Sequence, residues 1–191
     1  MLIAFNKPYG VICQFSPSGD KPTLKNFISQ KDIYPAGRLD TDSEGLLLLT
    51  DDGILQAKMT SPNSKVAKTY WAEVEGEATN SALAPLLKGV DLGDFKTAPA
   101  LRAETIAAPS IWSRDPPVRF RANIPTSWVA ITITEGKNRQ IRRMTAHVGL
   151  PTLRLIRVAI GTLDLMTIGL ELGQHQPVTT HDMGIGISRR R

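Results

Sequence analysis

The chain has 191 residues, a formal net charge of +5 and one cysteine, Cys13. This length can bury a core without disulfides or metals, and a single thiol excludes an intramolecular disulfide scaffold, which favours a reducing compartment. No apolar run approaches the ~18 residues of a membrane span, and the start MLIAFNKPYG lacks the pattern of a signal peptide. We therefore expect a cytoplasmic protein.

The first third of the chain predicts short elements joined by tight turns. Residues 2–15 predict two short strands around the turn Lys7-Pro8-Tyr9-Gly10, in which Pro and Gly occupy the positions that a type I turn prefers. A short helix is expected near residues 22–28, a strand over 46–50 and another short helix over 53–59.

The segment from Gly37 to Gly53, GRLDTDSEGLLLLTDDG, is the most informative part of this region. Gly37 lets the chain bend, and the leucine run that follows is too short for a helix and reads as a buried strand. Asp40, Asp42 and Glu44 cannot be buried among leucines, so we expect them at the end of the strand, within reach of solvent and substrate. A catalytic nucleophile would occupy the position of Asp40.

The rest of the chain alternates irregularly between strands and helices. Strands are expected over 68–75, 128–134 and 153–160, helices over 81–88 and from a cap at Asn138 to about Val148, and an irregular proline-rich excursion over 107–126. This order favours an α+β fold with a mixed, mainly antiparallel sheet flanked by helices and loops, with two lobes around a central cleft. Residues 1–172 are expected to form one catalytic domain, and residues 173–191, which end in Ser188-Arg189-Arg190-Arg191, a poorly ordered or accessory basic tail.

A calcium loop is an alternative interpretation of the acidic turn. Asp40, Asp42, Glu44 and Asp51 have the spacing of an EF-hand loop, with Gly45 at its sixth position. Leu48 stands where a polar residue is usual, Asp51 replaces the bidentate Glu, and residues 35–37 are a poor entering helix. We therefore expect no metal.

A stretch without acidic residues lies between Glu135 and Asp164 and contains six basic ones. Such a distribution is typical of a surface that binds a polyanion, although a solvated basic face is equally compatible with it. On the predicted helix, Ile141, Met144 and Val148 share the core face, whereas Arg142 lies at its border. An arginine at the border can reach inward to a carboxylate, although a surface salt bridge is the other reading.

Four segments together resemble the bacterial ribosomal pseudouridine synthases. They are NKPYG from Asn6, the Gly37 segment, KTYWAEVEG from Lys68 and EGKNRQIRRMTAHVGLPTLRLIRVAIG from Glu135. The stretch RDPPVRFRANIPTSW from Arg114 is similar to members that modify large-subunit rRNA. Many relatives carry a small N-terminal RNA-binding domain, whereas here the signature begins at Asn6, so the catalytic domain itself is expected to bind RNA.

The resemblance implies isomerisation of uridine to pseudouridine in 23S rRNA, or in a large-subunit assembly intermediate, by a monomer that needs no cofactor. It makes Asp40 the catalytic aspartate, Tyr70 the tyrosine that packs against the flipped base and Arg142 the partner of Asp40. Basic residues expected to contact RNA are Arg38, Lys7, Lys68, Lys137, Arg139, Arg143, Arg154 and Arg157. A non-catalytic rRNA-binding or ribosome-assembly protein is the competing hypothesis.

Overall fold

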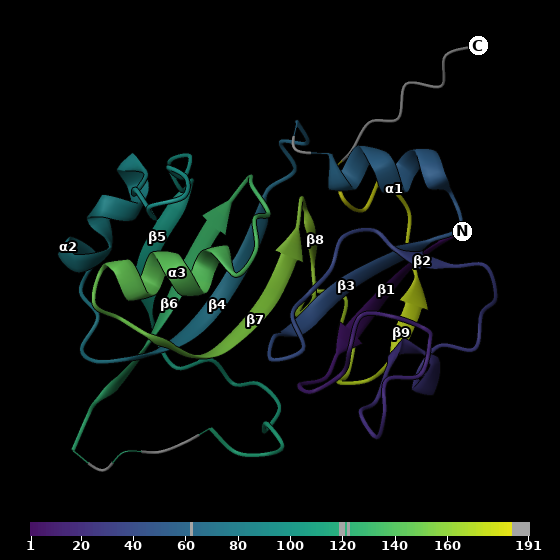
Figure 1. The fold of residues 1–191 in the computed structure, drawn as a ribbon, viewed down its shortest axis with the longest axis horizontal. Coiled ribbons are helices and arrows are strands. Elements are labelled where there is room, and N and C mark those ends of the chain that lie inside the picture. Colours follow the sequence, from purple (N-terminus) through teal and green to yellow (C-terminus); the bar gives the residue numbers. More distant parts are fainter. Residues whose placement is uncertain (62, 119–120, 122, 185–191) are drawn as a thin grey trace. The chain divides into compact units, whose positions relative to one another are not determined.

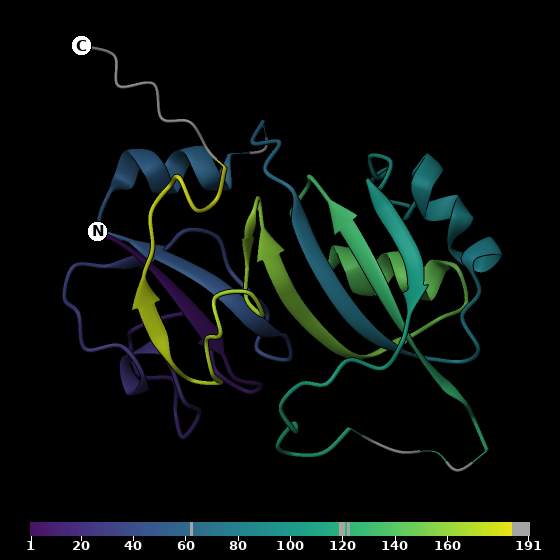
Figure 2. The same cartoon turned by 180° about the vertical axis from the view of Figure 1, so that it is seen from behind.

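The computed structural model describes residues 1–61, 63–118, 121 and 123–184. The chain divides into two units: the first comprises Met1–Val66 and Arg157–Arg191, and the second comprises Ala67–Ile156. One strand, β7 (Thr152–Ile160), crosses the boundary, so that its first five residues belong to the second unit and its last four to the first. Figure 1 and, from behind, Figure 2 show the elements of each unit.

The first unit is a small sheet with one α-helix. Its elements, besides the end of β7, are β1 (Leu2–Lys7), η1 (Leu24–Asn26), β2 (Tyr34–Pro35), β3 (Glu44–Thr50), α1 (Gly53–Thr60), β8 (Leu163–Asp164) and β9 (His175–Pro177). The strand order is β7-β3-β1-β9, with β2 on β3 and β8 on β7 (Figure 1). Every residue of β1 and β3 is buried, which explains why the leucines of β3 form a continuous run instead of alternating with polar residues.

The second unit is an antiparallel set of strands with a helix on one face. Its elements, besides the start of β7, are β4 (Lys68–Glu75), α2 (Asn80–Leu83), η2 (Ala84–Lys88), β5 (Arg102–Ile106), β6 (Thr126–Ile133) and α3 (Gln140–His147). The order is β5-β6-β4-β7, and α3 lies across one face of these strands in both views (Figures 1 and 2). In β4, buried Tyr70, Ala72 and Val74 alternate with half-buried residues, as expected for a strand packed on one side.

The predicted α+β class with a mixed, mainly antiparallel sheet is confirmed, and β4 has the predicted bounds. One predicted strand is wrong: the chain after Gly10 forms no strand, because its backbone bonds to the loop before η1, with Ile12 N–H donating to Pro22 O at 2.9 Å and Leu24 N–H to Gln14 O at 2.9 Å. Strand β5 was not predicted. The predicted helix over 81–88 is split into α2 and η2, and Pro85 lies in the first turn of η2.

The predicted cap of α3 is also wrong. The N-cap is Arg139, not Asn138, and its backbone is left-handed, with φ of 49°. Instead, the side chain of Gln140 closes the turn before the helix, since its Oε1 accepts from Lys137 N–H at 3.1 Å and its Nε2 donates to Glu135 Oε2 at 2.6 Å.

Within the tail that the sequence indicated from residue 173, residues 175–177 form strand β9 of the first unit. Strand β9 pairs with β1, placing Ile3 opposite Pro177 and Phe5 opposite His175. The arginines at the C-terminus lie outside the described residues, as do residues 119–120 and 122 of the excursion expected over 107–126. In the described part of the chain, no helix is both long and apolar enough to cross a membrane.

Candidate active site

The turn that carries Asp40 connects β2 to β3 in the first unit. Gly37 and Gly45, on either side of the turn, have backbone φ angles of 95° and 99°, which residues with a Cβ rarely adopt. Within the turn, Ser43 N–H donates to Asp40 O at 3.1 Å. The side chain of Asp40 is half-buried, between buried Leu39 and half-buried Thr41. The turn therefore presents two partly accessible carboxylates, Asp40 and the likewise half-buried Asp42, on a closely held backbone.

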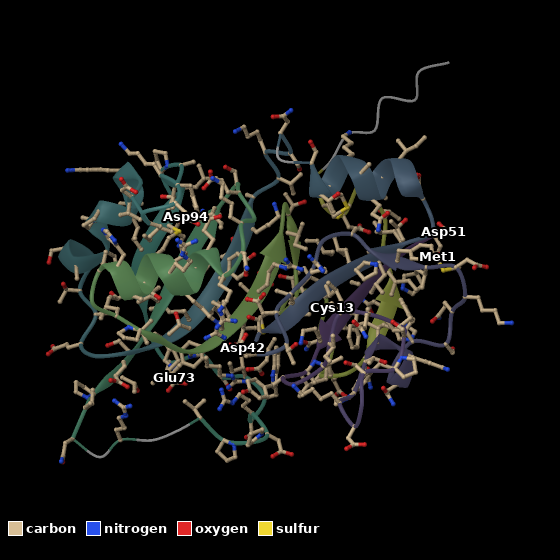
Figure 3. The ribbon with its side chains drawn as sticks, in the orientation of Figure 1. Met1, Cys13, Asp42, Asp51, Glu73 and Asp94 are labelled. Atoms are coloured by element: carbon tan, nitrogen blue, oxygen red, sulfur yellow. The ribbon has the colours of Figure 1, made fainter. Side chains whose placement is uncertain are left out.

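Two other acidic residues of the motif, Glu44 and Asp51, do not share the half-buried environment of Asp40. Glu44 is the first residue of β3 and only 1% exposed, so the prediction that it faces solvent is wrong. It immediately precedes Gly45, which lies opposite Lys7 of β1. At the other end of β3, Asp51 is exposed and pairs with the N-terminal ammonium of Met1 (Figure 3), whose hydrogen bond lowers the pKa of the Asp51 carboxyl.

This arrangement argues against the calcium loop. Glu44 begins β3 and Asp51 follows its last residue, seven positions later, a span of about 23 Å at ~3.3 Å per residue, so these two carboxylates cannot share a cation. Asp52 accepts instead from Ile54 N–H and Leu55 N–H as the N-cap of α1. Among the described residues, no three side chains of His, Cys, Asp or Glu gather to form a metal site.

The segment from Lys7 to Cys13, which we call the anchor segment, holds the backbone on both sides of Asp40. On one side, Leu39 N–H donates to Cys13 Sγ at 3.4 Å. On the other, Thr41 O accepts from Gly10 N–H at 2.8 Å and from Lys7 Nζ at 3.4 Å. The role of Cys13 could not be found from the sequence, because no pattern relates it to a residue 26 positions away.

Lys7 is a buried ammonium group, not a surface contact for RNA. It is 0% exposed, and its Nζ also donates to Pro8 O at 2.9 Å and to Val11 O at 2.7 Å. Burial lowers the pKa of Lys7 to about 8, against the opposing charges of Cys13, Glu44, Asp42 and Asp40. The expectation that Lys7 contacts RNA is therefore corrected.

Tyr70 and Arg142 belong to the second unit. Tyr70 lies on β4 opposite Ile131 of β6 and is 8% exposed, so most of its ring is packed inside the unit. Arg142 is half-buried on α3, and its Nη1 donates to Thr152 O at 3.3 Å. Of the predicted core face, Ile141 and Met144 are buried on α3, whereas Val148 is the half-buried C-cap after the helix.

Two further arginines from the expected RNA contacts are buried. Arg154 is 6% exposed, and its Nη2 donates to Trp112 O at 3.0 Å, while Arg157 is 4% exposed and donates from Nε to Leu46 O at 2.8 Å. Both lie on β7 and hold main-chain carbonyls of other segments. Their expected contact with RNA is corrected, because side chains that satisfy buried carbonyls are not available at the surface.

The other expected RNA contacts are at least partly accessible. Arg38, Lys137 and Arg139 are exposed, and Lys68 is half-buried. Arg143 is half-buried and donates to both carboxylate oxygens of Asp94 (Figure 3), which lowers the pKa of that carboxyl.

An aromatic ring that the sequence did not single out lies beside this basic group. The Nζ of Lys137 is 3.8 Å from the centre of the Phe95 ring, and the guanidinium of Arg143 is 5.0 Å from it. Part of the accessible positive charge of the second unit thus lies just before and along α3, and exposed Lys88, Lys96, Arg102 and Arg121 lie elsewhere in this unit.

Comparison with known proteins gives a consistent answer. The family model described as RNA pseudouridylate synthase matches residues 1–147. Ribosomal large subunit pseudouridine synthase E of Vibrio parahaemolyticus is 58% identical over 164 residues, which are 86% of this chain and 68% of that protein. The protein of the same name from Xanthomonas campestris is 54% identical over 170 residues, 88% of this chain and 91% of that protein.

A solved structure extends the likeness to the fold. The crystal structure of a pseudouridylate synthase, 29% identical, superposes with a TM-score of 0.76 over 96% of this chain and 72% of its own. The chain belongs to the RNA pseudouridylate synthase family, and it is accordingly an isomerase. The resemblance seen in its sequence motifs is thereby confirmed.

Proposed function

We propose that this chain isomerises uridine to pseudouridine in the rRNA of the large ribosomal subunit. The observation that carries the proposal is that this chain is much more similar in sequence to one named group of relatives than to the others. Proteins named large subunit pseudouridine synthase E are 54–58% identical, whereas large subunit pseudouridine synthase B of Bacillus subtilis is 35% identical and small subunit pseudouridine synthase A of Salmonella typhimurium is 33% identical. The substrate is 23S rRNA or a large-subunit assembly intermediate.

Asp40 is the catalytic carboxylate in this proposal. The reaction breaks the bond between N1 of the base and C1′ of the ribose, rotates the uracil and joins C5 to C1′, while C5 loses a proton and N1 gains one. A carboxylate that acts as nucleophile or base is sufficient for this chemistry, and no redox cofactor is needed. The fixed turn and the half-buried position of Asp40 support this role, because a nucleophile must be accessible and also held in one orientation.

Tyr70 and Arg142 are assigned to the same reaction. The target base must leave its stack, which costs a few kcal/mol, and packing against the ring of Tyr70 offsets about 1–3 kcal/mol of this cost. Arg142 pairs with Asp40 and favours the ionised carboxylate when the base excludes water. Arg38 assists base flipping or contacts the RNA backbone.

The remaining accessible basic residues contact phosphates. Lys137 and Arg139 are the strongest candidates, because both are exposed, whereas Arg143 already shares its charge with Asp94. Lys68 is half-buried at the start of β4 and contributes less. The enzyme acts as a monomer in the cytoplasm, and these residues provide its RNA contacts.

The decisive experiment maps pseudouridine on large-subunit rRNA by carbodiimide-blocked primer extension. rRNA from a strain that lacks the gene is incubated with the purified wild-type protein or with Asp40→Asn. We expect one new stop with the wild type and none with the variant. A protein that binds this rRNA tightly but produces no stop would instead be the non-catalytic assembly protein.

A further inference from the structure

We propose that Lys7 is a positioning residue whose buried positive charge holds the backbone next to Asp40, so that the rate of isomerisation depends on this charge. The inference rests on the proposed role of Asp40. It extends that role to a residue that touches neither base nor phosphate and that forms, with the rest of the anchor segment, the support of the catalytic turn.

The hydrogen bonds of Lys7 account for all three protons of an ammonium group. Its acceptors are the carbonyl oxygens of Val11 at 2.7 Å, Pro8 at 2.9 Å and Thr41 at 3.4 Å. The first two lie within the anchor segment, and the third belongs to the catalytic turn. A neutral amine has only two N–H donors, and we expect it to give up the longest of the three bonds, which is the one to Thr41.

The contact with Thr41 matters because of its place beside Asp40. Leu39 and Thr41, the two chain neighbours of Asp40, are both bonded to the anchor segment, through Cys13 and through Lys7 with Gly10. Loss of the Lys7 contact leaves Thr41 O with the Gly10 bond alone. The turn then keeps its fold but has more freedom at Asp40, and a shift of about 1 Å in a reacting group can slow catalysis ~100-fold.

The charged state of Lys7 is costly for the fold, which argues that it is kept for a reason other than stability. An apolar side chain of similar length would avoid the desolvation of a buried ammonium. The groups that act on Lys7 are Cys13 from the anchor segment, Asp40 and Asp42 from the turn, and Glu44 from β3, and all four favour the charged form. Burial outweighs them and lowers the pKa of Lys7 to about 8, so the contact with Thr41 weakens above this pH.

The test compares single-turnover rates of wild type and Lys7→Met on unmodified large-subunit rRNA between pH 6.5 and 9.5. We expect the wild-type rate to fall above pH 8 and to level off toward the rate of Lys7→Met, because the neutral amine loses the contact with Thr41. Lys7→Met should be at least ~10-fold slower at pH 7 and lack this fall. Titration of the RNA bases affects both enzymes equally, so the difference between the profiles is the informative quantity.

Two measurements separate positioning from RNA binding and from a general loss of fold. The dissociation constant for RNA and its salt dependence should be unchanged in Lys7→Met, because Lys7 is fully buried. The control Lys25→Met removes an exposed lysine of the first unit and should keep the wild-type profile. If Lys7→Met does not fold, Lys7→Arg replaces it; since arginine stays protonated, its rate should not fall above pH 8.

The outcomes are distinguishable. A wild-type protein that makes no pseudouridine overturns the proposed function and this inference with it. An active wild type whose rate has the same pH profile as Lys7→Met, or that shows no loss of rate above pH 8, overturns the inference alone and leaves the proposed function in place.

Discussion

The ammonium of Lys7 donates to the main-chain oxygen of Thr41, the residue that follows Asp40, although the two residues are 34 positions apart in the chain. This contact connects the NKPYG motif of the N-terminus to the GRLD motif of the catalytic turn. The two motifs are separate signatures in the sequence and one structural assembly in the first unit.

Asp40→Asn should abolish pseudouridine formation and preserve RNA binding. Asparagine has the size of aspartate but cannot act as a nucleophile or base, so the single-turnover rate should fall by at least about 1,000-fold, as losses of catalytic groups commonly do. The dissociation constant for rRNA should change by less than about threefold. Asp51→Asn, at the far end of β3, is the matched control and should retain the wild-type rate. Normal turnover in Asp40→Asn would contradict the assignment.

Arg142→Ala should slow the reaction by about 100-fold with little change in RNA affinity, because the arginine is proposed to act on Asp40 and not on phosphates. Arg142→Lys should recover only part of the rate, since lysine lacks the planar fork. Arg102→Ala removes an exposed arginine of the same unit that pairs with Glu104, and it serves as control. Equal rates for Arg142→Ala and this control would remove Arg142 from the mechanism.

The salt dependence of binding should distinguish accessible from buried arginines. Arg139→Gln should lower the slope of log affinity against log salt by about 0.7, the value for one phosphate contact on single-stranded RNA. Arg154→Gln should leave the slope unchanged and lower the free energy of unfolding by about 1–3 kcal/mol, because Trp112 O loses its partner. Fluorescence titrations at several salt concentrations and urea unfolding measure the two quantities. A reduced slope in Arg154→Gln would contradict its placement.

Local patterns predicted the elements whose environment is set by their own sequence. The alternation in KTYWAEVE gave the bounds of β4, and the leucine run indicated a strand buried on both faces. Asp40 could be singled out because the glycines of its turn and the strand that follows are local features. The sequence motifs also gave the family, which the comparisons confirmed.

Burial of charge could not be predicted in the same way, because it depends on partners far away in the chain. Arg157 donates to a carbonyl 111 positions away, and Arg154 to one 42 positions away. Both appear in the sequence as members of an acid-free basic stretch, which is equally compatible with a binding surface. Glu44 was misplaced for a related reason: it is the buried first residue of β3, whereas its local context in the sequence is an acidic turn.

The stability of the protein should depend on pH through Lys7 in a direction opposite to the activity. The pKa of Lys7 is about 8 in the folded protein and 10.5 when the side chain is fully hydrated, as in the unfolded chain. Between these two pH values the unfolded chain therefore binds more protons than the folded one. Stability therefore rises with pH across this window. Relative to Lys7→Met, the free energy of unfolding of the wild type should increase by about 2–3 kcal/mol from pH 7 to pH 10.

Urea unfolding of both proteins at pH 7, 8, 9 and 10 measures this difference, and titration of all other groups cancels in the comparison. A difference that stays constant or decreases with pH would show that Lys7 is not an ammonium desolvated by the fold. If they are measured, opposite trends of rate and stability in the wild type would exclude unfolding as the origin of the alkaline loss of activity. The wild type gains stability relative to Lys7→Met as the pH rises. If unfolding caused the loss of rate above pH 8, the rate of Lys7→Met would therefore fall at least as much as that of the wild type. A rate that falls only in the wild type, while its relative stability increases, assigns the loss to the contact between Lys7 and Thr41.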